Sequence, residues 1–160
     1  MPTIEIKTRI EADLKTCFDL SRNIDFHQKS LEYSKEKAIA GKTSGLIELD
    51  EWVTWEAIHF GIKQRLTSKI TKLESPNYFV DEMVSGAFKS FKHEHIFKKS
   101  YDHKFDVYYT LMIDKFHFES PFGIIGRLIN FLFLKSYMKK LLISRNSMLR
   151  KKAEEISNKI

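Results

Sequence analysis

The spacing of apolar residues changes along the chain, and each change marks a different kind of element. Residues 3–10 alternate apolar and charged side chains for most of their length, which predicts a half-buried strand. Residues 11–21 have helical spacing, and Asp13 stands where the N-cap of that helix is expected. Residues 25–34 predict a second short helix, with Asp25 as its N-cap.

A period of two dominates the middle of the chain. Residues 36–50 predict a short strand followed by a turn, and turn residues then separate five longer strands. These strands are expected at residues 50–60, 62–73, 78–88, 90–101 and 105–119. Phe60 and Gly61 are expected to form a tight two-residue turn, which places His59 opposite Ile62.

The last part of the chain returns to a helical pattern. Beyond Gly123 it contains no proline and its only glycine is Gly126, so one long helix is predicted over residues 123–155. Successive hairpins form an antiparallel sheet, and the apolar face of such a sheet needs a covering layer. We therefore expect an α+β fold in a single domain of residues 1–160. It has about six to seven antiparallel strands, two short helices after the first strand, and a long C-terminal helix against the sheet.

Cysteine usage and the N-terminus indicate the cellular setting. Cys17 is the only cysteine, so a disulfide within the chain is excluded, and its apolar neighbours predict that it packs as a small hydrophobic residue. Residues 1–10 lack a basic start followed by an apolar block, so no signal peptide is expected. We expect a cytoplasmic protein in a reducing compartment.

Basic residues are concentrated near the C-terminus. Residues 120–153 contain no acidic residue but eight basic ones, namely Arg127, Lys135, Lys139, Lys140, Arg145, Arg150, Lys151 and Lys152. The other 19 of the 27 Lys and Arg residues share the rest of the chain with all 21 Asp and Glu residues. A basic helix face is usually a solvated surface, but it also suits an anionic partner. Nucleic acid is not the expected partner, because no DNA- or RNA-binding motif accompanies the basic helix.

The start of the long helix has more apolar surface than one buried face requires. Residues 124–134 are apolar almost all round, interrupted by Arg127 and Asn130, yet they are too short to span a bilayer. Packing in the core, a dimer interface and a transient contact with a membrane surface each account for this surface. The chain is therefore expected to be a monomer or a homodimer, with membrane contact through the basic helix as an open alternative.

Alternation along the strands predicts which side chains face the interior. The inward set is mostly aromatic and includes a few polar groups. It consists of Trp55, His59, Phe79, Asp81, Met83, Phe91, His93, His95, Phe97, Tyr108, Thr110, Met112, Asp114 and Phe116. We interpret this set as the candidate ligand-binding wall.

Two histidines at residues 93 and 95 are the most distinctive polar feature of the inward set, while Glu94 between them faces outward. The expected register places His93 opposite about Met83 and His95 opposite about Asp81. On the other side, one of the two histidines lies beside Thr110, Met112 or Asp114. The sequence therefore predicts a small polar cluster of His93, His95, Asp81 and Asp114 on an aromatic wall.

Four interpretations of this cluster are open. Two histidines and carboxylates suit a zinc or iron site, but no cysteine supports one and the spacing is not that of the helical HExxH motif. We therefore expect no metal and no cofactor. A histidine beside a carboxylate also suits acid–base catalysis. A few polar groups in an apolar pocket orient a bound ligand, and buried polar groups can simply satisfy one another.

The element order resembles the helix-grip fold of the SRPBCC superfamily, also called START-like, in which a curved antiparallel sheet wraps a long C-terminal helix around a cavity. Residues 79–97 also resemble a bacterial subgroup of polyketide cyclase/dehydrase-like or ligand-binding SRPBCC proteins. That subgroup has Phe-x-Asp, a turn with glycine, then His-x-His-x-Phe, and a Pro-x-Gly start to its last helix. The matching residues here are Phe79, Asp81, Gly86, His93, His95, Phe97, Pro121 and Gly123.

This resemblance implies binding of a small hydrophobic or amphipathic ligand, such as a lipid, a polyketide-like molecule or an aromatic compound. The binding site would be an internal cavity between the sheet and the long helix. The alternative is a cyclase or dehydratase that uses the inward His/Asp cluster for acid–base catalysis. The superfamily contains both carriers and enzymes, so the resemblance does not decide between them.

Overall fold

The computed structural model describes residues 2–120 and 123–160, except for the side chains of residues 124–132. Its strands are β1 (Thr3–Ile10), β2 (Lys37–Gly41), β3 (Trp52–His59), β4 (Ile62–Glu74), β5 (Tyr78–Ser85), β6 (Ser90–Asp102) and β7 (Val107–Glu119). Its helices are α1 (Leu14–Ser21), α2 (Ile24–Ser30), the short 3-10 helix η1 (Glu32–Ser34) and α3 (Gly123–Asn158). Pro121, which matched the Pro-x-Gly pattern, and the side chain of Arg127 lie outside the described residues.

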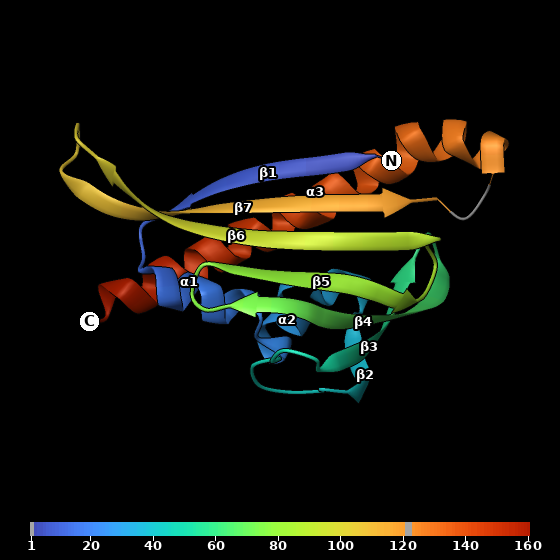
Figure 1. The fold of residues 1–160 in the computed structure, drawn as a ribbon, viewed down its shortest axis with the longest axis horizontal. Helices are drawn as coiled ribbons and strands as arrows, with labels where there is room; N and C mark the ends of the chain where they lie inside the picture. The colour runs from blue at the N-terminus through green and yellow to red at the C-terminus, as the bar shows by residue number, and fades with distance from the viewer. Residues whose placement is uncertain (1, 121–122) are drawn as a thin grey trace.

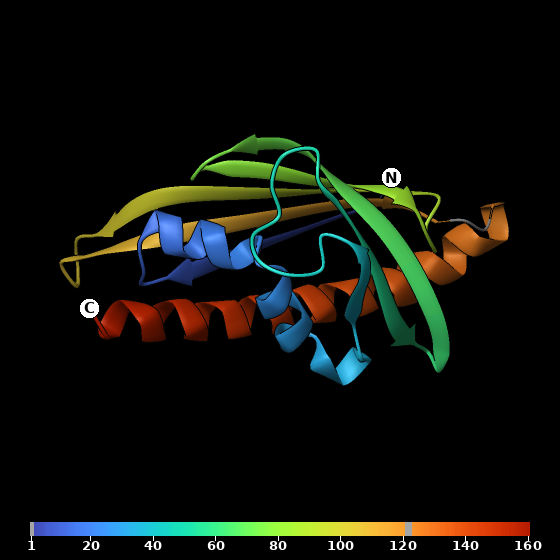
Figure 2. The same cartoon turned by 90° about the horizontal axis from the view of Figure 1, so that it is seen from below.

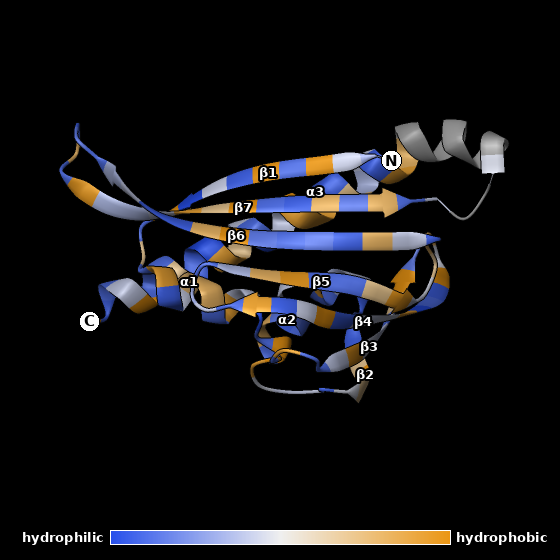
Figure 3. Ribbon diagram, in the orientation of Figure 1, coloured by the Kyte–Doolittle hydropathy of each residue, from blue (hydrophilic) through white to orange (hydrophobic). Residues whose placement is uncertain are grey.

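All described strands form one antiparallel sheet in the order β1-β7-β6-β5-β4-β3-β2. The sheet curves, and α3 runs along its concave side, while α1 and α2 lie beside α3 (Figures 1 and 2). Hydrophobic and hydrophilic bands alternate along the strands (Figure 3), as expected of a sheet with one buried face. The predicted α+β architecture, with two short helices after the first strand and a long C-terminal helix, is confirmed.

The two short helices begin at side-chain caps. Asp13 caps α1 as predicted, because its carboxylate accepts a hydrogen bond from the Thr16 backbone N–H at 2.9 Å. The predicted cap of α2 is wrong: Asn23 is the cap and accepts from the Phe26 N–H. Asp25 lies in the first turn of α2 and accepts from the Gly45 N–H, which ties α2 to the loop before β3.

The core fills the space between α1 and the sheet. Phe18 of α1 packs edge-on against Phe79 and Phe97, with ring centroids 5.6 and 5.5 Å apart. Cys17 is completely buried beside it, as predicted for a small hydrophobic residue. Burying a large aromatic side chain of this kind contributes about 1.5–3 kcal/mol of stability. This packing closes the interior at the α1 end and leaves the cavity described below toward the start of α3.

Two hairpins test the expected strand register. His59 pairs with Ile62 as predicted, and Phe60 and Gly61 both have positive φ angles of 53° and 72°, as a two-residue hairpin turn of this type requires. The β5–β6 register is two residues from the prediction, since His93 pairs with Asp81 and His95 with Phe79. The turn is centred near residue 87, whereas the prediction placed it near Lys89, and the even displacement of the pairing leaves the same side chains facing inward.

Candidate functional site

A cavity of about 440 Å³ lies between the concave face of the sheet and α3. Its wall is predominantly apolar and comes from α2, β3, β4, β5, β6, β7 and α3. The apolar lining includes Ile24, Ile47, Val53, Trp55, Ala57, Leu66, Ile70, Phe79, Phe88, Phe91, Phe116, Leu134, Met138, Leu141 and Leu142. These side chains reach one space because the curved sheet and the long helix both turn their apolar faces inward.

A group of polar side chains interrupts this apolar lining. We call it the polar strip, and it consists of Ser68, Asp81, His93, His95 and Arg145. Other polar residues also line the cavity, including Arg22, His27, Glu36, Gln64 and Arg65. The rings of the two histidines lie 3.8 Å apart between centroids, and His95 stacks on the Phe79 ring at 4.1 Å. The strip therefore places hydrogen-bonding groups against an aromatic surface, which is the arrangement that fixes the orientation of a ligand in a pocket.

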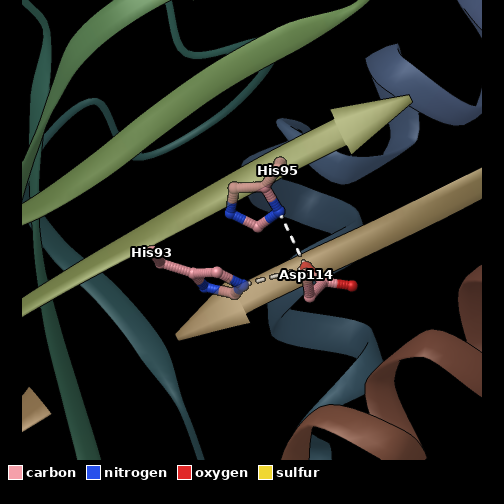
Figure 4. Close-up of side chains that lie close together, drawn as sticks. All are labelled: His93, His95 and Asp114. Carbon is pink, nitrogen blue, oxygen red and sulfur yellow. Dashed lines mark hydrogen bonds and ion pairs between the residues drawn. The ribbon is translucent and has the colours of Figure 1, made fainter. Parts of the chain in front are cut away.

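Behind the strip, Asp114 of β7 holds both histidines (Figure 4). Its Oδ1 atom accepts a hydrogen bond from His93 Nε2 at 2.9 Å. His95 Nδ1 lies 3.0 Å from the same oxygen, an ion-pair distance, but its direction does not make a regular hydrogen bond. Asp114 is completely buried, so it acts on the cavity only through the histidines that it positions.

Two residues of α3 complete the environment of Asp114, and sequence reasoning missed both as site residues. Asn146 donates to Asp114 Oδ2 at 2.6 Å, and a guanidinium nitrogen of Arg145 lies 3.8 Å from Oδ1. Arg145 also donates to the backbone carbonyl of Ser21 at 3.0 Å. A signal was present, because the helical spacing of the buried residues Leu142 and Leu149 places residues 145 and 146 on the same face.

The protonation states of the cluster follow from these contacts. Burial alone would raise the pKa of Asp114, but its contacts with His93 and His95, foremost the hydrogen bond from His93, hold that pKa well below its usual range. Burial, together with the neighbouring His93, lowers the pKa of His95 to about 3, although Asp114 opposes this shift. At neutral pH Asp114 is ionised and His95 is neutral, so the His95 ring offers one donor and one acceptor.

Asp81 differs from Asp114 in that no cation among the described residues lies within ion-pair distance of it. Its Oδ1 atom is buried and receives no hydrogen bond from the described residues. Burial raises the pKa of Asp81, while a side-chain hydrogen bond from Ser68 opposes that shift in part. The side chain keeps some accessible surface because it lines the cavity.

His93, His95 and Asp114 also meet the basic requirement for a metal site, since their ligand atoms lie within 4.8 Å of one another. These ligand types suit zinc. Two observations oppose this interpretation: Asp114 already accepts from donors on both oxygens, and Arg145 brings a fixed positive charge to 3.8 Å from Oδ1. The geometry therefore favours a hydrogen-bonded cluster over a cation site.

The hairpin between β3 and β4 reaches the helix on the far side of the cavity. His59 Nδ1 lies 2.6 Å from the Tyr137 hydroxyl of α3, and the Phe60 ring packs on Tyr137 with centroids 4.5 Å apart. Burial lowers the pKa of His59. This contact joins the tip of the hairpin to the helix and bounds the cavity there.

The structure brings most of the predicted inward residues to the cavity, but not all of them. The predicted residues that line it are Trp55, His59, Phe79, Asp81, Phe91, His93, His95 and Phe116. Met83 is half-buried and packs against the buried cluster that contains Phe91 and Phe116. Phe97, Thr110, Met112 and Asp114 are buried in the protein and are not among the lining residues.

The prediction that Tyr108 faces the interior is wrong, since 62% of this residue is exposed. The hairpin between β6 and β7 extends past the other strands (Figure 1), so no helix covers its inner face there. Tyr108 instead packs against the Tyr101 ring and lies under the Lys99 ammonium group. Alternation gives the face of a strand, but it does not show where the covering layer ends.

No protein-family model and no curated protein match the chain. Solved structures do share its fold. The protein TTHA0849 from Thermus thermophilus has a TM-score of 0.75 at 16% identity, over 98% of this chain and 99% of that chain. A START superfamily protein from Mycobacterium smegmatis has a TM-score of 0.68 at 11% identity, over 96% and 98%.

A third solved structure extends the comparison to plants. Ginseng major latex-like protein 151 from Panax ginseng has a TM-score of 0.64 at 12% identity, over 95% of this chain and 97% of that chain. Identities this low establish the fold alone. Together the three structures confirm the helix-grip fold that the resemblance to SRPBCC proteins implied.

Proposed function

We propose that this chain, which has the helix-grip fold of START-like proteins, binds a small hydrophobic or amphipathic molecule in the cavity between its sheet and α3. The observation that carries this proposal is the cavity itself, at about 440 Å³ and with a mostly apolar lining. Ligand pockets typically measure about 300–1,000 Å³ and combine apolar walls with a few polar groups. The solved structures of the same fold support the proposal through the START superfamily protein among them.

The lining indicates how such a ligand would lie. Trp55, Phe91 and Phe116 offer flat apolar surface, which suits an aromatic or polyketide-like ring system or a lipid chain. The polar strip occupies one part of the wall, so a polar group on the ligand would lie against it. A ligand with one polar end and a larger apolar body fits this division.

A titration with the neutral apolar dye N-phenyl-1-naphthylamine tests the proposal. We expect saturable one-site binding with increased dye fluorescence. Ala57 is buried and lines the cavity, so Ala57→Trp should fill the space and weaken dye binding by about tenfold or more. The matched control is Ile58→Trp on the opposite face of β3, which should bind the dye as the unmodified protein does. Equal dye binding by both variants would remove the cavity as the binding site.

Acid–base catalysis as a cyclase or dehydratase is the second candidate, and one observation favours it. His93 lines the cavity while Asp114 accepts its Nε2 hydrogen bond at 2.9 Å, which is the pairing that positions a catalytic histidine. Replacing His93 and His95 with Gln distinguishes the two functions. A carrier should still bind dye within about threefold of the original affinity, whereas an enzyme should lose turnover of a poly-β-ketone substrate.

We also propose that ligand transfer involves contact with a membrane surface. Among the described residues, no helix is long and apolar enough to cross a membrane. Near the hairpin contact, however, Phe60, Ile62 and Phe133 are 64%, 62% and 72% exposed, and α3 carries lysines nearby. Exposed aromatic residues beside basic ones suit the interface of an anionic membrane. Co-sedimentation with anionic vesicles at low salt should detect binding, and Phe60→Ser with Phe133→Ser should abolish it.

A further inference from the structure

Asp81 is the one carboxyl group in the polar strip, and its partners within the protein are incomplete. It projects from β5, where its cross-strand neighbours are Ile70 and His93. Among the described residues, no cation lies within ion-pair distance of it, and no donor reaches its buried Oδ1 atom. A buried polar group left without a partner destabilises a fold, so such a group requires an explanation.

Asp114, the neighbouring buried carboxylate, has donors for both of its oxygens, so the missing hydrogen-bond donor is a property of Asp81 and not of every carboxylate on this face. Asp114 lies nearby on the same face of the sheet and receives donors from His93 and Asn146. Ser68 interacts with the Asp81 carboxyl, and its hydrogen bond only partly offsets the rise in pKa that burial causes. Because Asp81 lines the cavity, a molecule in that cavity is well placed to supply the missing donor.

The charges around Asp81 restrict what that donor can be. The buried guanidinium of Arg145 also lines the cavity, so a cationic head group would lie in a strip that already holds a positive charge. An anionic head group would be repelled by the Asp81 carboxylate. A hydroxyl group carries no charge, donates to a carboxylate and accepts from a carboxylic acid, so it matches Asp81 in either protonation state.

We propose that Asp81 anchors the hydroxyl group of an uncharged hydrophobic ligand, so that the cavity selects alcohols or phenols over hydrocarbons, carboxylates and amines of the same shape. This inference rests on the proposed ligand-binding function and specifies its ligand class. The hydroxyl group lies against the polar strip, and the apolar body of the ligand occupies the aromatic part of the cavity. Asp81 contributes selectivity, while the apolar walls contribute most of the affinity.

Isothermal titration calorimetry with four naphthalene derivatives tests this selectivity at pH 7. The probes are 2-naphthol, 2-methylnaphthalene, 2-naphthoate and 2-naphthylmethylammonium, which share one ring system and differ in the head group. The unmodified protein should bind 2-naphthol about tenfold more tightly than 2-methylnaphthalene, since a buried hydrogen bond contributes about that factor. The two charged probes should bind more weakly than 2-naphthol.

Three variants assign the effect to Asp81. Asp81→Leu should lose the preference for 2-naphthol while its affinity for 2-methylnaphthalene stays the same or rises. Asp81→Asn keeps an acceptor oxygen and should retain most of the preference. Glu82→Gln, the matched control, changes a neighbouring carboxylate on the other face of β5 and should behave as the unmodified protein does.

The outcomes separate this inference from the proposed function. If 2-methylnaphthalene binds and 2-naphthol shows no advantage, or keeps its advantage in Asp81→Leu, the hydroxyl anchor is overturned and ligand binding stands. Tightest binding of 2-naphthoate or of 2-naphthylmethylammonium overturns it in the same way. If no probe binds and the dye titration also fails, the proposed function falls and this inference falls with it.

Discussion

Strands β6 and β7 carry the same chemistry on opposite faces, in two very different environments. On the outer face, Glu94 accepts a hydrogen bond from Tyr78 at 2.8 Å and lies 3.0 Å from His117 Nε2. On the inner face, Asp114 accepts from His93 at 2.9 Å and from Asn146 at 2.6 Å. The outer side chains of Glu94 and His117 remain 20% and 27% exposed, whereas Asp114 is fully buried.

This difference shows that burial, rather than contact geometry, determines what each carboxylate contributes. Water screens the outer pair and solvates either partner when the other is removed, so such pairs typically contribute about 0–1 kcal/mol. Asp114 is completely buried, so the donors that lose it are left with an uncompensated buried partner site. The inner cluster is therefore expected to fix the two histidines rigidly, which suits a wall that orients a ligand.

The largest expected difference between the two faces is the loss of unfolding free energy when Asp114 or Glu94 is removed. Asp114→Ala leaves His93, Asn146 and Arg145 without their buried partner, and we expect it to lower the free energy of unfolding by about 3–5 kcal/mol. Glu94→Ala should lower it by about 1 kcal/mol or less. Urea denaturation of both variants measures the two values. Similar losses would contradict the claim that burial separates the two faces.

The pH dependence of stability provides the second contrast. The folded pKa of His95 is about 3, below its ordinary value of 6.5, so the unfolded chain takes up a proton first as the pH falls. Stability should therefore decline between pH 6.5 and pH 3, and Asp114, whose pKa is also lowered, adds to the decline below about pH 4.

The matched variants for this pH profile are His95→Gln and His117→Gln. His95→Gln removes the inner titration and should flatten the curve between pH 6.5 and pH 4. His117→Gln changes the outer face and should leave the shape of the curve unchanged. Melting temperatures measured from pH 6.5 to pH 4 test this prediction. If the melting temperature of His95→Gln falls with pH as much as that of the unmodified protein, His95 does not cause the decline.

Asp81 offers a third test. It lies on the same inner face as Asp114, but replacing it should raise the free energy of unfolding instead of lowering it. Its raised pKa means that ionisation is disfavoured in the folded chain, so Asp81 costs stability at neutral pH. Asp81→Asn should therefore raise the free energy of unfolding at pH 7 by about 1–3 kcal/mol, and the gain should shrink as the pH falls toward 4. A loss of stability at pH 7 would show that Asp81 has a favourable partner after all.

The smallest expected effect belongs to the outer pair. A double-mutant cycle that combines Glu94→Gln with His117→Gln should give a coupling energy of about 0.2–1 kcal/mol, and added salt should reduce it. Urea denaturation at low and high salt measures this coupling. A coupling above about 2 kcal/mol that resists salt would place Glu94 and His117 in the same energetic class as the inner cluster.

The sequence predicted the elements because their signals are local. Alternation located β4 and β6 and placed Phe91, His93 and His95 on one inward face, since the two-residue period is a property of the strand itself. The scarcity of Gly and Pro after residue 123 located α3. The hairpin of Phe60 and Gly61 followed from turn chemistry alone.

The remaining features depend on contacts between distant parts of the chain. Arg145 and Asn146 reach Asp114 only because α3 crosses the sheet at that position, and one sequence does not encode a crossing point in any local pattern. Tyr108 was misplaced because the end of the covering layer is a tertiary property. The β5–β6 register was mispredicted because it depends on where the loop between the two strands is centred. Moving that centre by one residue shifts every pair by two.

The central claim is that the cavity holds a small hydrophobic molecule, and native mass spectrometry of protein purified from its own cells tests it most directly. The unmodified protein and Ile58→Trp should each carry an additional mass of one organic molecule per chain, extractable into organic solvent. Ala57→Trp, whose side chain occupies the cavity, should lack that mass. The same bound mass in all three proteins, or its absence from all three together with no saturable dye binding, would contradict the account.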